Sequence, residues 1–212
     1  MDQKERKLIV FLAGELRNED NIKKLISIGP FDFFAADAGY RLANKMNLTL
    51  HRVFGDFDSS EVPNLPNLTV YPCEKDQTDS ELALDLAIQD GYKCIWMIAP
   101  FGGRLDHTMA NIALLEKANN NQVDLKLYDG ENLAFLLGEG KHTLDPKYRY
   151  ISFFPIEQQA TISLNGLKYP LDHQTVFRSI PMCISNEPSE ELPTIEIHDG
   201  KILCICIEQE AI

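Results

Sequence analysis

Short apolar runs and amphipathic stretches alternate along the first 129 residues of the chain. The apolar runs have the length of β-strands, and the stretches between them have helical spacing. Because strands that alternate with helices are typical of a parallel α/β sheet, we predict a Rossmann-like sheet in this part of the chain. The predicted strands are Leu8 to Ala13, Phe31 to Ala36, Arg52 to Phe54, Leu68 to Tyr71, Cys94 to Ala99 and Val123 to Tyr128.

Two of the predicted helices have recognisable starts. One begins at Thr78, because Thr78 and Glu81 stand at the two key positions of a capping box. The other begins near Asp106 and continues to Ala118. Both helices follow directly on predicted strands, as the alternating pattern requires.

The pattern changes beyond Gly130, where helical spacing gives way to short strand-like runs separated by Gly, Pro and Asn. This predicts a small carboxyl-terminal β-sandwich. The boundary is expected between Asp129 and Gly140, which gives domains at 1–130 and 131–212. No long Pro/Ser-rich linker separates them, so we expect two domains that pack together. The clearest runs are Tyr150 to Phe154, Ala160 to Leu164 and Ile202 to Ile207.

The composition of the chain favours a folded protein and excludes some classes of partner. The chain has 212 residues, 44% of them hydrophobic, which is enough for a buried core. A formal net charge of −12 argues against nucleic acid and anionic membranes as partners. The charged amino terminus precedes an apolar run too short for a signal peptide or a membrane span, so a cytoplasmic location is expected.

The five cysteines form no CxxC pair and are odd in number, which favours free thiols in a reducing compartment. Cys204 and Cys206 alternate along an apolar strand. We therefore expect both to be buried on the same side of that strand.

Polar clusters follow several of the predicted strands. Since the carboxyl ends of parallel strands meet at one edge of a sheet, these clusters should converge there. They are Asp37-Ala38-Gly39, Gly55-Asp56-Phe57-Asp58-Ser59, Lys75-Asp76-Gln77-Thr78-Asp79 and Gly102-Gly103-Arg104-Leu105-Asp106-His107.

Together the clusters contain what is needed to hold a magnesium-bound polyphosphate. In an extended segment Asp56 and Asp58 point to one side, where they can share a hard cation. Taken alone, this pair would be an ordinary turn, Asp79 a helix-start acid and Lys75 a solvated loop residue. Their expected convergence favours the polyphosphate site.

The third long cluster has the features of a phosphate cradle. Gly102 and Gly103 allow close approach of the backbone, and Arg104 can bind two phosphate oxygens. The following helix offers free amides from near Asp106. His107 alone would be a helix-start hydrogen-bonding residue. Neither the Walker A motif nor G-x-G-x-x-G occurs in the chain.

These clusters, in this order and spacing, resemble those of the thiamine pyrophosphokinase family. Gly166-Leu167-Lys168-Tyr169-Pro170-Leu171 and Ser185-Asn186-Glu187 resemble the vitamin-binding β domain of that family. The resemblance implies transfer of a diphosphate group from ATP to the hydroxyl of thiamine, giving thiamine diphosphate and AMP, with Mg²⁺ required. It also implies a homodimer whose thiamine pocket is shared between the α/β domain of one subunit and the β domain of the other.

The resemblance also implies a role for each site residue. Lys75 and Arg104 would offset charge on the phosphates. The expected metal ligands are Asp56, Asp58 and Asp79. The expected ATP-binding residues are Asp37, Lys75, Thr78, Gly102, Gly103, Arg104, Asp106 and His107. The expected thiamine-binding residues are Gln77, Asp79, Ser185 and Asn186.

One departure concerns stacking on the pyrimidine ring. Some family members carry a tryptophan shortly after the Ser-Asn position, whereas residues 188–193 contain no aromatic side chain here. Phe177 or Tyr169 could stack instead, although core packing is the expected role of each.

Two other functions fit the same clusters. One is diphosphate transfer to another alcohol. The other is a sensor that binds a nucleotide or thiamine compound without turnover. The sensor is the less favoured of the two, because it has less need for so many transition-state contacts.

Overall fold

The computed structural model describes residues 6–57, 67–71 and 76–208, and the chain divides into two compact units, 1–130 and 131–212. It confirms the predicted fold class, an α/β unit followed by a β-sandwich. No helix in the described part of the chain is long and apolar enough to cross a membrane.

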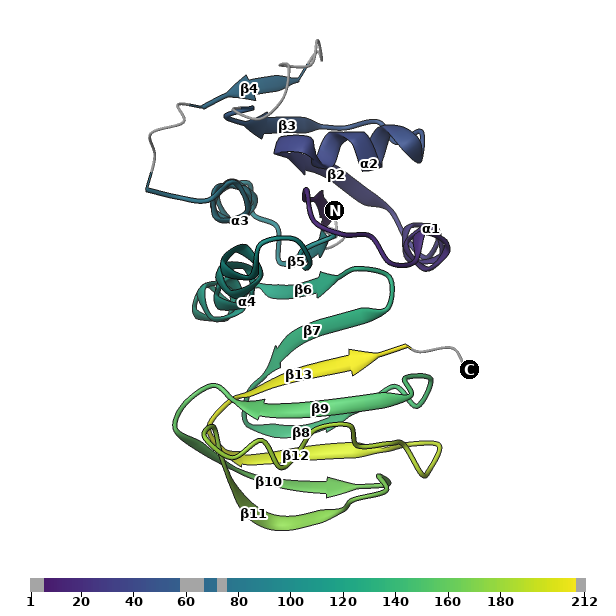
Figure 1. Ribbon diagram of the computed structural model, residues 1–212, viewed down its shortest axis with the longest axis vertical. Helices are drawn as coiled ribbons and strands as arrows, with labels where there is room; N and C mark the ends of the chain where they lie inside the picture. Colours follow the sequence, from purple (N-terminus) through teal and green to yellow (C-terminus); the bar gives the residue numbers. More distant parts are fainter. Residues whose placement is uncertain (1–5, 58–66, 72–75, 209–212) are drawn as a thin grey trace, which may run out of the picture. The chain divides into compact units, whose positions relative to one another are not determined.

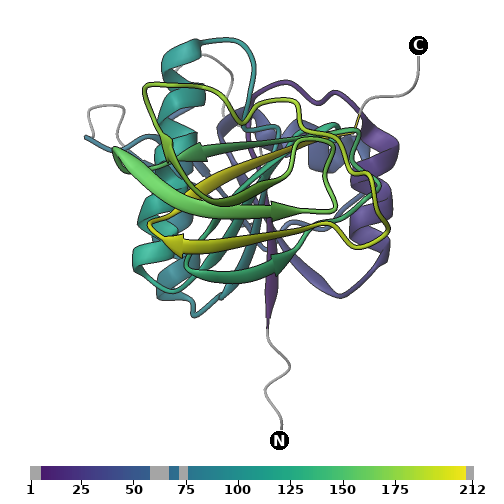
Figure 2. The same ribbon diagram turned by 90° about the horizontal axis from the view of Figure 1, so that it is seen from below.

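The first unit is a parallel sheet with strand order β4-β3-β2-β1-β5-β6. Helices α1 and α2 lie on one face of this sheet, and α3 and α4 on the other (Figures 1 and 2). The strands are β1 (Lys7–Phe11), β2 (Phe31–Ala36), β3 (Arg52–Gly55), β4 (Leu68–Val70), β5 (Cys94–Ile98) and β6 (Asp124–Tyr128). The helices are α1 (Glu19–Ser27), α2 (Tyr40–Lys45), α3 (Asp79–Gln89) and α4 (Leu105–Asn120), with a 3₁₀ turn, η1, at Asp37–Gly39.

Helices on both faces bury most of the central strand β1. Leu8, Ile9, Val10 and Phe11 of β1 are all 0% exposed, so this strand is a continuous apolar run. All six predicted strands exist, and their ends differ from the prediction by at most two residues. The strand order changes direction between β1 and β5. In sheets of this type, ligands bind beyond the carboxyl ends of the strands at such a switch point.

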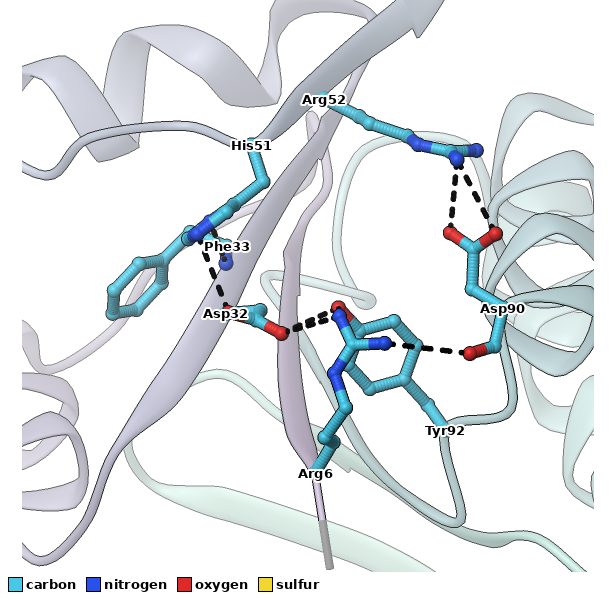
Figure 3. A network of polar contacts seen from close by, with 7 residues as sticks. All are labelled: Arg6, Asp32, Phe33, His51, Arg52, Asp90 and Tyr92. Carbon is cyan, nitrogen blue, oxygen red and sulfur yellow. Dashed lines mark hydrogen bonds and ion pairs between the residues drawn. The ribbon is translucent and has the colours of Figure 1, made fainter. Parts of the chain in front are cut away.

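A polar network lies at the amino ends of the parallel strands, opposite their carboxyl ends (Figure 3). Asp32 accepts hydrogen bonds from the Tyr92 hydroxyl at 2.6 Å and from the Arg6 guanidinium at 2.9 Å. His51 Nε2 lies 3.3 Å from the other Asp32 oxygen. The network therefore joins β1, β2, β3 and the loop before β5 through one carboxylate.

The second unit is built from antiparallel strands. One sheet has β13 between β7 and β9, and the other has the order β11-β10-β12-β8. Cys204 and Cys206 are buried, with their sulfur atoms 3.8 Å apart, which confirms the same-side prediction, while Cys73 lies outside the described residues. The strands are β7 (Asn132–Leu137), β8 (Gly140–Thr143), β9 (Tyr150–Pro155), β10 (Gln159–Asn165), β11 (Leu171–Phe177), β12 (Thr194–Asp199) and β13 (Ile202–Ile207).

Candidate active site

A cavity of about 490 Å³ opens at the carboxyl edge of the parallel sheet. Its wall is formed by the loops that follow β1, β2, β3 and β5 and by the first turns of α3 and α4. The volume lies within the usual range for a small-molecule site. The wall brings together the following residues from the predicted clusters: Asp37, Asp56, Gln77, Thr78, Asp79, Gly102, Gly103, Arg104 and His107.

One part of the wall is acidic. Asp37, Asp56 and Asp79 line the cavity from three different loops, and Glu15 joins them. Asp58, Ser59 and Lys75 were also predicted here, and they lie outside the described residues. Carboxylate oxygens are the ligands that Mg²⁺ prefers.

The chemistry of these acids fits a metal that is shared with a substrate, because carboxylate oxygens are hard ligands. Mg²⁺ is usually bound by one or two carboxylates together with substrate phosphates and water. The acidic wall therefore fits a metal that arrives with a polyphosphate.

Two helix starts give another part of the wall a positive potential. The amino-terminal turns of α3 and α4 both reach the cavity, and each offers backbone N–H groups and the positive end of a helix dipole. Thr78 begins α3 as predicted, because its hydroxyl accepts from the Glu81 amide at 3.2 Å. The Glu81 carboxylate accepts a hydrogen bond from the Lys117 ammonium at 2.9 Å. The two helix starts are suited to bind an anion.

Arg104 lines the cavity and forms an ion pair with Asp106. Its guanidinium donates two hydrogen bonds to Asp106, at 3.1 and 2.5 Å. This interaction, aided by the His107 backbone amide, lowers the pKa of Asp106 to about 2. Of the predicted ATP-binding residues that the structure describes, Asp106 is the one outside the cavity wall. Asp106 thus orients Arg104, and both side chains remain exposed.

The backbone is strained after three strands of the parallel sheet, and two of the strained residues, Asp37 and Ala99, line the cavity. Asp37, Phe57 and Ala99 follow β2, β3 and β5, and their φ angles are 45°, 51° and 58°. Non-glycine residues seldom adopt this left-handed conformation, which is found preferentially at functional sites. At Gly102 the φ angle of 89° and the nearby Glu15 side chain, 2.7 Å from where a Cβ would stand, both require glycine.

Sequence reasoning missed part of this wall. Gly14, Glu15 and Asn111 line the cavity, and no cluster included them. The Gly14 and Glu15 amides donate to the Ala99 and Phe101 carbonyls, which joins the loops after β1 and β5. The same rule that found the other clusters applies to Gly14 and Glu15, because they also follow a predicted strand, whereas Asn111 lies within α4.

The remaining thiamine candidates, Ser185 and Asn186, belong to the second unit. Ser185 is exposed and has a φ of 54°. Asn186 is 3% exposed, and its side-chain amide exchanges hydrogen bonds of 3.0 and 2.9 Å with the Tyr169 backbone. In this structure the Asn186 amide fixes the Tyr169 loop.

The expected core packing of Tyr169 and Phe177 is wrong. Tyr169 is 58% exposed and Phe177 is 42% exposed. Phe177 is the last residue of β11, where the alternation of the strand turns it away from the buried Val176. Both rings are therefore accessible to a ligand.

Two family models match the chain. One is described as thiamin pyrophosphokinase, catalytic domain, and covers residues 32–127, and the other as thiamin pyrophosphokinase, vitamin B1 binding domain, and covers residues 141–202. A thiamine pyrophosphokinase of Bacillus subtilis (strain 168) is 35% identical over 162 residues, which are 72% of this chain and 76% of that protein.

Solved structures agree with these matches. A crystal structure of thiamine pyrophosphokinase from Bacillus subtilis superposes with a TM-score of 0.87 at 27% identity, covering 96% of this chain and 100% of that one. The thiamin pyrophosphokinase from Geobacillus thermodenitrificans gives a TM-score of 0.84 at 28% identity, covering 97% and 99%. With its cavity, its two units and these relatives, the chain belongs to the thiamin pyrophosphokinase family.

Proposed function

We propose that the protein transfers a diphosphate group from ATP to the hydroxyl oxygen of thiamine, giving thiamine diphosphate and AMP. The observation that carries this proposal is one cavity, in a chain of this family, that joins an acidic wall to two helix starts and an arginine. An acidic wall suits a divalent metal, and the helix starts and the arginine suit phosphate oxygens.

The transfer requires alignment and charge neutralisation more than a covalent intermediate. The thiamine hydroxyl oxygen forms a bond to the β-phosphorus of ATP, the bond from that phosphorus to the oxygen of the α-phosphate breaks, and AMP leaves. The hydroxyl proton is lost in the same process. Arg104 and Lys75 offset the negative charge, and the backbone of Gly102 and Gly103 approaches the nucleotide.

The other predicted residues complete this scheme. Asp37, Thr78, Asp106 and His107 serve the ATP side, with Asp106 acting through Arg104. Asp56, Asp58 and Asp79 would hold Mg²⁺, which when bound neutralises phosphate charge. Gln77, Asp79, Ser185 and Asn186 serve the thiamine side, with Asn186 shaping the loop that carries Tyr169.

We also propose that the protein is a homodimer with shared active sites. Apolar side chains on and after β11 are exposed in the single chain, which supports a subunit interface at this position. They are Phe177 (42%), Ile180 (55%), Met182 (51%) and Ile184 (49%). A cytoplasmic location stays a prediction from the sequence.

The test is to incubate the purified protein with ATP, Mg²⁺ and thiamine and to separate the nucleotides. We expect one AMP for each thiamine diphosphate, and no ADP. Asp56→Asn should lower the rate by about a hundredfold or more while leaving the melting temperature near that of the wild type. Asp20→Asn, the same change at a side chain of α1 that is 84% exposed and lies outside the cavity wall, is the matched control and should retain activity.

Two results would redirect the proposal. Formation of ADP would indicate transfer of a single phosphoryl group. Turnover with another alcohol in a panel of acceptors, but not with thiamine, would favour the other diphosphotransferase.

A further inference from the structure

Gln77 lines the cavity, and its side-chain amide is hydrogen-bonded to Asp85, a residue that does not line the cavity. The Gln77 Nε2 atom donates a hydrogen bond of 2.7 Å to Asp85, one and a half turns into α3. An ionised carboxylate can only accept hydrogen bonds, so the atom of Gln77 that faces it must be the amide nitrogen. The Asp85 carboxylate therefore selects one of the two orientations of the Gln77 amide.

Lys117 on α4 holds this carboxylate in place. Its ammonium donates to both Asp85 oxygens, at 2.7 and 2.8 Å, and to Glu81 at 2.9 Å. The Lys117 and Asp85 side chains are 31% and 27% exposed, so water screens this pair only in part. Partial burial lowers the pKa of Lys117, but the hydrogen bonds to Asp85 and Glu81 outweigh it and raise the pKa above its ordinary value.

We propose that Asp85 is a positioning residue of the thiamine site, which holds Nε2 of Gln77 so that the carbonyl oxygen of Gln77 accepts a hydrogen bond from thiamine. This inference rests on the proposed function. Thiamine carries two donors that such an oxygen could receive, the exocyclic amino group of its pyrimidine ring and the hydroxyl that attacks ATP. In either case, a substrate donor replaces the water that the carbonyl oxygen would otherwise bind.

The test is the variant Asp85→Asn, which preserves the size of the side chain but can turn an N–H toward Gln77. This favours the flipped Gln77 amide, which presents N–H to the substrate instead of an acceptor. We expect kcat/KM for thiamine to fall about tenfold, the effect of one lost hydrogen bond, while the KM for ATP changes less than twofold. If Asp85 acts through Gln77, the same change in a Gln77→Ala background should have no further effect.

An analogue of thiamine with a carbonyl oxygen in place of the amino group distinguishes the two donors. If the amino group is the partner, the wild type prefers thiamine, and Asp85→Asn reduces that preference. If the hydroxyl is the partner, the variant loses kcat equally with both substrates. Unchanged kcat/KM for both substrates, or an equal loss in the Gln77→Ala background, would overturn the inference.

Glu81→Gln provides the matched control. It removes the other carboxylate that binds Lys117 but leaves the hydrogen bond between Gln77 and Asp85, so thiamine kinetics should stay within twofold of the wild type. An equal loss in this variant would assign the effect to general packing of α3 on α4 and overturn the positioning role. A wild type that forms no AMP overturns the proposed function and this inference with it, whereas an active wild type with an unaffected Asp85→Asn variant overturns this inference alone.

Discussion

Gly14 lies where the loops after β1 and β5 are in contact. A Cβ at this position would stand 2.4 Å from the Ala99 carbonyl oxygen and 2.5 Å from that of Phe101, and both are backbone atoms. Backbone contacts of this kind cannot be relieved by rotating a side chain. The position therefore fixes the spacing of the loops after β1 and β5.

We expect Gly14→Ala to separate these loops. The free energy of unfolding should fall by about 1–3 kcal/mol, as for other overpacked sites, and ATP should bind more weakly. Thermal unfolding and equilibrium binding of ATP would measure the two effects. Gly29→Ala is the control, because among the described residues no atom beyond its chain neighbours lies within 4 Å of a Cβ placed there, and the free energy of unfolding should change by about 0.5 kcal/mol or less.

Some single positions could be predicted from the sequence and others could not. Asp37, Asp56, Asp79 and Arg104 were assigned correctly to the cavity, because they are charged residues in the segments that follow predicted strands. The exposure of Tyr169 and Phe177 could not be read in the same way. It depends on which neighbouring strands cover each ring, and aromatic composition alone does not reveal this.

At the scale of elements, the two ends of the parallel strands have different roles. The carboxyl ends carry the cavity, while the amino ends are joined by the network around Asp32 (Figure 3). Burial opposes ionisation of Asp32, but hydrogen bonds from Tyr92 and Arg6 outweigh this effect and lower its pKa below the ordinary value of 3.8. The charged carboxylate is thus favoured by the fold.

The sign of this pKa change predicts how stability depends on pH. A carboxyl group whose pKa is lowered by folding stabilises the protein fully above its ordinary pKa, and this contribution is lost as the pH falls through the folded-state value. Asp32→Asn should therefore cost about 1–3 kcal/mol at neutral pH, and the difference from the wild type should shrink below about pH 4. Chemical denaturation at several pH values would measure it. An equal difference at pH 3 and pH 7 would contradict the prediction.

The strands of the first unit and helices α3 and α4 followed from the sequence because their signals are local, whereas α1 and α2 were not predicted by residue. Central strands are continuous apolar runs, and Thr78 marks the start of α3 by a side-chain cap. Strands β7, β8, β11 and β12 were not predicted by residue. Of these, β8, β11 and β12 belong to the sheet in which β10 changes register against both neighbours, and β7 pairs with the distant β13, so their pairing depends on contacts distant in sequence.

At the scale of the whole molecule, the gathering of the clusters in one cavity was predictable, since it follows from strand direction in a parallel sheet. The proposed contribution of a second subunit could not be predicted in this way. It depends on surface complementarity between two copies, which a single sequence does not express through local patterns.

The proposed homodimer leads to a test at this scale. Ile180→Glu places a charge among the exposed apolar side chains of the second unit, so we expect it to convert dimers to monomers in sedimentation velocity and to abolish thiamine turnover. Ile28→Glu is the matched control, because Ile28 is 77% exposed but belongs to the first unit. A wild type that sediments as a monomer and still forms AMP would contradict the homodimer.

The paired cysteines of β13 have a practical consequence. Both side chains are almost inaccessible, and burial raises the pKa of the Cys204 thiol, so the reactive thiolate is disfavoured there while the strand is in place. A thiol-specific dye would reach these sulfur atoms only when β13 leaves its neighbours. The rate of dye incorporation at Cys204 and Cys206, measured by peptide mass spectrometry, would thus report how fast the β-sandwich opens. No cysteine would have to be introduced by mutation.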